Sequence, residues 1–99
     1  MTYQVEYTQE VYDDLKEITK WYSLQRENLD SEFLLSLEAV MLQLRRNPYQ
    51  YEEKIRSNRM ALLQRFPYRV IYKIYDTKIL ALGIFHTSRN PKLLTKRVK

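Results

Sequence analysis

The sequence predicts one α+β domain in which a hairpin of two helices packs on one face of a small antiparallel sheet. Three observations predict this fold. Residues 3–7 alternate between apolar and polar side chains, as a half-buried strand does. Residues 8–46 carry apolar side chains at helical spacing. Three segments rich in Val, Ile, Leu and Tyr then come close together between residues 59 and 86. The expected order is β-α-α-β-β-β, and all 99 residues form one domain.

The first helix is expected from Thr8, an N-cap residue, to about residue 27. Its apolar residues recur at steps of four, three and four and define one buried face: Val11, Leu15, Ile18 and Tyr22. Asn28 can cap the second helix, which Asn47 and Pro48 end. The buried face of that helix has the same spacing, with Leu34 and Met41 widening it: Leu29, Phe33, Leu37, Val40 and Leu44. The short connection makes the helices an antiparallel hairpin.

Residues 48–58 show no strong period and are expected to form a loop. Strands are predicted at residues 59–65, 68–75 and 79–86. Their connections are so short that the three strands should form an antiparallel meander. The basic segment 87–99 follows and is expected to be a loosely held tail.

Connections of three residues would set the register of the meander and divide its side chains between two faces. The helices would then cover an apolar face: Met60, Leu62, Val70, Tyr72, Ile74, Leu80, Leu82 and Ile84. The opposite face would collect mostly basic and aromatic side chains: Arg59, Arg65, Arg69, Lys73, Tyr75 and Phe85. A shift of one residue would bury arginines, which is costly. The prediction is an open, basic sheet face opposite the helices.

Charge is divided unevenly along the chain. Residues 1–53 have a net charge of −6 and residues 54–99 a net charge of +11, within a total of +5. Such a basic half predicts an anionic partner, either nucleic acid or an acidic protein segment.

Composition excludes many enzyme classes. The chain has no cysteine, one histidine and one glycine, so thiol catalysis, a multi-histidine metal site, the P-loop and the dinucleotide-binding fingerprint are all excluded. We expect neither a cofactor nor a metal. No apolar run is long enough for a membrane span. Residues 1–6 do not resemble a signal peptide, and a cytoplasmic protein is expected.

Two motifs and the element order resemble the RelE/ParE superfamily, the toxins of type II toxin–antitoxin modules. The first motif is Arg65-Phe66-Pro67-Tyr68-Arg69-Val70-Ile71-Tyr72-Lys73-Ile74. The second is Ile84-Phe85-His86-Thr87-Ser88-Arg89-Asn90-Pro91. The first helix, with Trp21 and Tyr22, is also similar to that of the family, so the resemblance covers nearly the whole chain. It implies a RelE/ParE-like fold.

The resemblance implies a growth-inhibiting toxin that is neutralised by a cognate antitoxin. Such a toxin binds operator DNA only through its antitoxin. ParE-like members inhibit DNA gyrase, and RelE-like members cleave mRNA on the ribosome. Residues 87–99 contain no tyrosine, which departs from the nuclease pattern and places the chain closer to ParE-like members of plasmid-stabilization modules. A RelE-like endoribonuclease and an inactive homologue that acts only with the antitoxin at an operator remain the alternatives.

Metal-independent RNA cleavage needs a base, an acid and cations that stabilise the phosphorane. For a RelE-like activity, the resemblance implies phosphate contacts from Arg69 and Arg89 and a basic catalytic residue at Lys54. His86 is the further catalytic candidate. His86 is the chain's one imidazole. In the expected register it lies on the helix side of the sheet, where a structural role is the simpler interpretation unless a bulge turns it outward.

The partner-binding residues predicted from the open face are Arg59, Arg65, Arg69, Lys73 and Phe85. Tyr49 and Tyr51 lie in the expected loop, where they can stack on bases or on a partner peptide. They can equally form a lid over the edge of the helix hairpin. A solvated basic surface is the plain alternative for the arginines.

Overall fold

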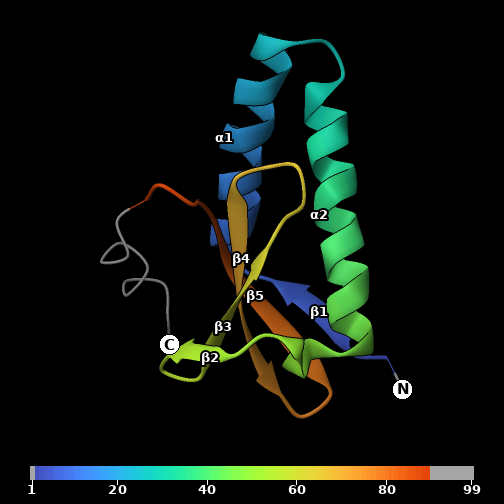
Figure 1. Ribbon diagram of the computed structural model, residues 1–99, viewed down its shortest axis with the longest axis vertical. Helices are drawn as coiled ribbons and strands as arrows, with labels where there is room; N and C mark the ends of the chain where they lie inside the picture. Colours follow the sequence, from blue (N-terminus) through green and yellow to red (C-terminus); the bar gives the residue numbers. More distant parts are fainter. Residues whose placement is uncertain (1, 90–99) are drawn as a thin grey trace.

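A computed structural model describes residues 2–89 and has the predicted fold class, with two helices on one face of a sheet (Figure 1). The elements follow in this order: β1 (Gln4–Tyr7), α1 (Gln9–Gln25), α2 (Leu29–Arg46), the 3-10 helix η1 (Pro48–Gln50), β2 (Glu53–Ile55), β3 (Asn58–Leu62), β4 (Tyr68–Tyr75) and β5 (Lys78–His86). η1 and β2 lie in the segment that was expected to be a loop. Of the predicted tail, residues 90–99 lie outside the described residues.

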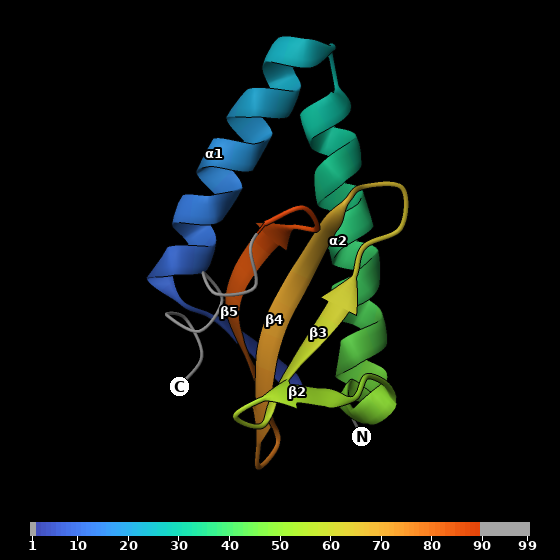
Figure 2. The same ribbon diagram turned by 60° about the vertical axis from the view of Figure 1, so that its left-hand side comes forward.

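Over the described residues the sheet has five strands in the order β1-β5-β4-β3-β2. β1 runs parallel to β5, and the other neighbours are antiparallel. The chain from α1 to β4 makes the long crossover that a parallel pair requires. The helix hairpin projects beyond the sheet at its α1–α2 turn, as both views show (Figure 2). Neither of the two helices is long and apolar enough to cross a membrane.

The helix ends follow local rules. The Thr8 side chain accepts a hydrogen bond from the Val11 N–H at 3.4 Å, as expected of an N-cap. Asn28 precedes α2 but makes no side-chain cap; it occupies the left-handed region at φ 66°, which asparagine tolerates well. At the other end of α2, the Asn47 side chain accepts from the Tyr49 N–H at 3.1 Å and starts η1.

The β4–β5 connection differs from the expected three residues and changes which side chains of β5 face the helices. Tyr75 pairs with Lys78 across a two-residue turn, so Ile79 and Ala81 face the helices. Leu80 and Leu82, predicted on that face, lie on the open face instead. A bulge at Leu82 adds one residue to β5, so that Ile84 pairs with Val70 and lies on the helix-facing side, as predicted.

The Leu63 N–H donates to the Tyr68 carbonyl at 2.9 Å, so the paired strands are connected by the four residues 64–67 rather than by three. The pairing of β3 is therefore shifted by one from the prediction. Leu62 pairs with Arg69, and Met60 with Ile71, so both lie on the open face rather than under the helices. Ala61 and Leu63 are buried under the helices in their place. A change of one residue in a connection turns over every side chain of the strand, because side chains alternate with a period of two.

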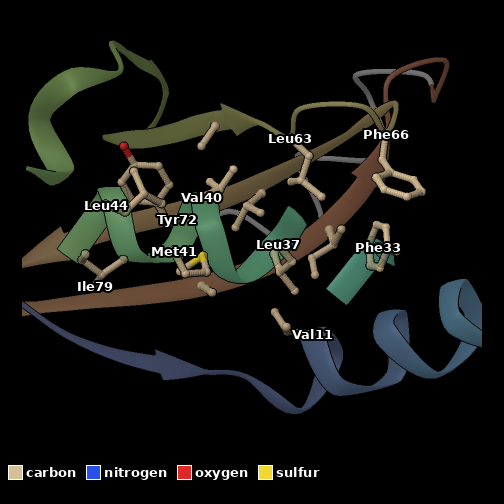
Figure 3. Packing of buried hydrophobic residues seen from close by; sticks show 14 of the residues in the cluster. Val11, Phe33, Leu37, Val40, Met41, Leu44, Leu63, Phe66, Tyr72 and Ile79 are labelled. Carbon is tan, nitrogen blue, oxygen red and sulfur yellow. The ribbon is translucent and has the colours of Figure 1, made fainter. Parts of the chain in front are cut away.

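The main core lies between the helices and the sheet (Figure 3). Most of the predicted apolar positions of α1 and α2 pack into it, while Leu34 is 42% exposed. Phe33 is fully buried, and three aromatic rings surround it: Tyr22, Phe66 and Tyr68. The ring centroids lie 5.4–5.5 Å from that of Phe33, a separation at which aromatic pairs attract.

A second, smaller cluster lies on the open face. Ile71, Leu82 and Phe85 are buried there, with Met60 and Leu80 packed against them. The open face is therefore apolar in its centre, not basic throughout.

Tyr72 is a fully buried tyrosine whose hydroxyl donates to the Pro48 carbonyl at 2.7 Å. Burial raises the pKa of this hydroxyl to about 12. We expect Tyr72→Phe to lower the free energy of unfolding by about 1–3 kcal/mol, because the buried carbonyl loses its donor. Urea unfolding measures this, with Tyr12→Phe as the control because Tyr12 is 50% exposed. Equal stability of the two variants would contradict the expectation.

Candidate functional site

The open face presents Arg69, Lys73 and Phe85, as the sequence predicted. Arg69 is exposed and pairs with the buried Phe85 on β5 and with Leu62 on β3. No hydrogen bond or ion pair joins the Arg69 side chain to another of residues 2–89. Its guanidinium can therefore offer its fork of donors to a phosphate or carboxylate.

Arg89 lies beside the same aromatic ring. Its guanidinium carbon is 5.9 Å from the centroid of Phe85, and its backbone N–H donates to the His86 carbonyl at 3.0 Å in the turn after β5. Because Arg69 pairs with Phe85, the structure brings both arginines to one residue. Arg69, the cross-strand partner of Phe85, and Arg89, beside its ring, are the strongest candidates for anion binding here.

His86 lies on the other side of the sheet. It pairs with Tyr68, a residue of the helix-side core, and its ring meets the Tyr68 ring edge-on at 5.2 Å. The Nδ1 atom accepts from the Ser88 N–H at 3.1 Å, and the Ser88 Oγ lies 2.7 Å from it. A backbone N–H can only donate, so Nδ1 carries no proton in this arrangement and the neutral ring is protonated at Nε2.

Arg59 does not lie on the open face, contrary to the prediction. It pairs with Tyr72 and therefore faces the helix side, where its side chain is 13% exposed. The guanidinium donates to the Tyr51 carbonyl, forms an ion pair with Glu53 at 3.4 Å, and lies 5.1 Å from the centre of the Tyr49 ring. The one-residue shift of β3 places this arginine on the helix side of the sheet. There the Tyr51 carbonyl, the Glu53 carboxylate and the Tyr49 ring stabilise its partly buried charge.

The two loop tyrosines lie beside Arg59, and Lys54 lies on β2. Tyr49 is 56% exposed and meets Tyr3 edge-on at 6.4 Å, whereas Tyr51 is half-buried against the core. Lys54 forms an ion pair with Glu52 at 3.8 Å. Lys54 is on β2, two strands away from Arg69 on β4, about 10 Å across the sheet from spacing alone. The structure does not bring these residues to the Arg69–Arg89 pair.

Arg65 also lies off the open face, in the β3–β4 connection with a φ of 72°. Its guanidinium is 2.8 Å from the Glu32 carboxylate on α2 and stacks on the Phe66 ring at 5.6 Å. Glu32 also binds Arg26, again at 2.8 Å. One carboxylate thus links the helix turn to the connection that carries Phe66 and Pro67. Hydrogen bonds from Arg65 and then Arg26 lower the pKa of Glu32.

This lowered pKa predicts a pH-dependent contribution to stability. Because the folded-state pKa lies below the usual 4.5, the contribution is full above the unfolded pKa and is lost as pH falls through the folded one. Glu32→Gln should therefore melt at a lower temperature than the wild type at pH 7, and the difference should shrink toward pH 3. Thermal melting across pH 3–7 measures this; a difference independent of pH would contradict the ion-pair account.

A cleft between α1 and the paired ends of β4 and β5 was missed in the sequence. It encloses about 510 Å³, a size typical of ligand sites, and its polar and aromatic lining includes Asp14, Glu17, Trp21, Tyr68, His86 and Arg89. The Asp14 carboxylate accepts from the Ile84 N–H at 3.0 Å where β5 extends beyond β1. The feature of the sequence that could have indicated this cleft is Trp21, a large aromatic residue next to the buried face of α1 but not part of it. Within residues 2–89, no three His, Cys, Asp or Glu side chains gather as a metal site.

Comparisons with known proteins agree with this architecture. The family model described as the ParE toxin of the type II toxin–antitoxin system parDE matches residues 5–91. No curated protein matches the sequence. A chain of the chromosomal ParDE system from P. aeruginosa has a TM-score of 0.75 at 16% identity, covering 86% of this chain and 96% of that one.

Solved RelBE complexes share the fold as well. A chain of RelBE2 from Mycobacterium tuberculosis has a TM-score of 0.61 at 22% identity, covering 87% of this chain and 99% of that one. A chain of the E. coli RelBE complex has a TM-score of 0.61 at 12% identity, covering 88% and 99%. These identities show a shared fold, whereas the family match spans most of the sequence. The protein belongs to the ParE toxin family of type II toxin–antitoxin systems.

Proposed function

We propose that the protein inhibits growth in the cytoplasm by binding DNA gyrase, in the manner of ParE-like toxins, rather than by cleaving RNA. The observation that carries this proposal is the separation of Arg69, His86 and Lys54, three of the four groups that a RelE-like nuclease would need, although His86 and Arg89 line one cleft. His86 lies on the helix side of the sheet and Arg69 on the open side. Lys54 is two strands from Arg69 and is paired with Glu52. General acid–base catalysis requires such groups within hydrogen-bond reach of one reacting centre.

A cognate antitoxin is the proposed inhibitory partner. The P. aeruginosa, M. tuberculosis and E. coli structures that share this fold are described as toxin–antitoxin systems or complexes, which supports a partner of that kind. The positive charge of residues 54–99 favours an acidic segment on the open face around Arg69 and Lys73. Association with such a segment should slow as salt increases, because screening weakens electrostatic steering.

A RelE-like nuclease is the second candidate, and the positions of Arg69 opposite Phe85 and of Arg89 beside the Phe85 ring favour it. Two arginines that reach the same phosphate can hold it, although they supply neither the base nor the acid. The third candidate, an inactive homologue that contacts operator DNA only with its antitoxin, predicts no toxicity at all.

Controlled expression separates the three candidates. The chain is induced from a tightly repressed promoter while growth, translation and plasmid supercoiling are followed, and purified protein is added to a gyrase supercoiling assay. The proposal expects growth arrest with loss of supercoiling before translation declines. Ribosome-dependent mRNA cleavage with intact gyrase activity would contradict gyrase inhibition and support the RelE-like function. Normal growth with soluble toxin accumulating would favour the inactive homologue.

A further inference from the structure

We propose that the cleft between α1 and the ends of β4 and β5 receives an arginine side chain presented by the protein partner. This inference rests on the proposed function only in assuming a protein partner. It concerns Glu17 and Trp21 on α1, outside the open face, although Phe85 and Arg89 line the cleft as well. It assigns the opposite charge to the part of the partner that binds there.

The charge of the cleft is opposite to that of the protein. The protein carries a net charge of +5, yet the charged side chains that line the cleft are Asp14, Glu17 and Arg89, a formal net charge of −1. Asp14 already accepts from the Ile84 N–H. Glu17 is exposed, and no hydrogen bond or ion pair joins its carboxylate to another of residues 2–89. Its carboxylate is therefore available to a guanidinium, with which carboxylates form paired hydrogen bonds.

An aromatic shelf lies one helical turn from this carboxylate. Glu17 and Trp21 are four residues apart on α1 and so share one side of the helix. Trp21 is 58% exposed, and Tyr22 meets it edge-on with ring centroids 5.6 Å apart. A guanidinium that binds a carboxylate can also stack on an indole, which is the best aromatic partner for a cation. Lysine fits this pair of groups less well because it lacks a planar face.

The side of α1 that carries Glu17 and Trp21 continues with exposed apolar surface. Leu24 follows Trp21 by three residues and is 75% exposed. Large apolar side chains grouped on a surface mark interaction sites more often than solitary ones do. The order Glu17, Trp21, Leu24 along α1 therefore fits a partner segment in which an arginine is flanked by apolar residues.

The test uses the indole of Trp21 as the reporter, because the chain contains a single tryptophan. Purified full-length protein is titrated with the peptide acetyl-Leu-Arg-Leu-amide and with its citrulline counterpart, which keeps the planar shape but lacks the charge. The indole N–H resonance and the tryptophan fluorescence follow binding. We expect saturable binding of the arginine peptide, at least about fivefold tighter than the citrulline peptide, as loss of one charge-assisted contact implies.

Two variants locate the contact. Glu17→Gln should reduce the preference for arginine over citrulline to about one, while Glu27→Gln, which removes the same charge outside the cleft, should leave it unchanged. Equal binding of both peptides, an unchanged preference in Glu17→Gln, or tighter binding of acetyl-Leu-Glu-Leu-amide would each overturn the inference. The titration involves neither growth nor gyrase, so its failure leaves the proposed function standing, and failure of the toxicity assay leaves this result unaffected.

Discussion

Cells that express Arg69→Ala should grow at close to the uninduced rate, while the purified variant stays as stable as the wild type. Arg69 is exposed on the open face, and its neighbours in the strand, Val70 and Tyr72, pack into the core. Truncating the side chain therefore removes an anion-binding fork and little packing, and the free energy of unfolding should change by less than about 0.5 kcal/mol. Growth after induction and thermal melting are the two measurements.

Two substitutions control the Arg69 experiment. Arg46→Ala removes another exposed arginine, at the end of α2, and should leave growth arrest intact. Arg69→Lys should restore toxicity only in part if the contact is bidentate, because an ammonium group cannot reproduce the planar fork. Full toxicity in a folded Arg69→Ala protein would remove this residue from the functional surface, and loss of folding would show that it stabilises the domain.

The largest loss of stability is expected from Phe33→Ala. Phe33 is fully buried on α2 and packs against Tyr22 of α1, Phe66 of the β3–β4 connection and Tyr68 of β4. The substitution removes the ring at which these elements meet and leaves a cavity, at a cost of about 3–5 kcal/mol. That is a large fraction of the roughly 5–15 kcal/mol that holds a domain of this size together.

Denaturant unfolding measures this effect, with Leu35→Ala as the control. Leu35 is the second residue after Phe33 on the same helix but is 65% exposed, so its truncation should cost under about 0.5 kcal/mol. A cost below about 1.5 kcal/mol for Phe33→Ala would mean that the aromatic rings close the cavity by moving together. The cleft would then change shape, because Tyr22 and Tyr68 also line it.

Local sequence patterns were enough to predict the two helices. The apolar spacing of α1 and α2, the Thr8 cap and the stop at Asn47 and Pro48 were readable because each depends on residues within one or two turns. The extent of β4, including the burial of Val70 and Tyr72, was predicted for the same reason. The motif around Arg69 led to the toxin family that the family comparison later matched over residues 5–91.

The faces of β3 and β5 could be decided only in three dimensions. A strand's own alternation says which residues share a face, but not which of its two faces meets the helices; that depends on the length of each connection and on the bulge at Leu82. Arg59 was predicted outside and lies inside, where Tyr51, Glu53 and Tyr49 accommodate its charge.

The cleft depends on tertiary structure for a related reason. Its walls come from α1, the start of β4, and the end of β5 with the turn after it. α1 is far from β4 and β5 in the chain. Trp21 signals an exposed aromatic residue in the sequence, but only the packing of α1 against β5 places it in the same cleft as His86 and Arg89. Short-range order follows from propensity and periodicity, whereas a site shared by distant segments exists only once the core has brought those segments together.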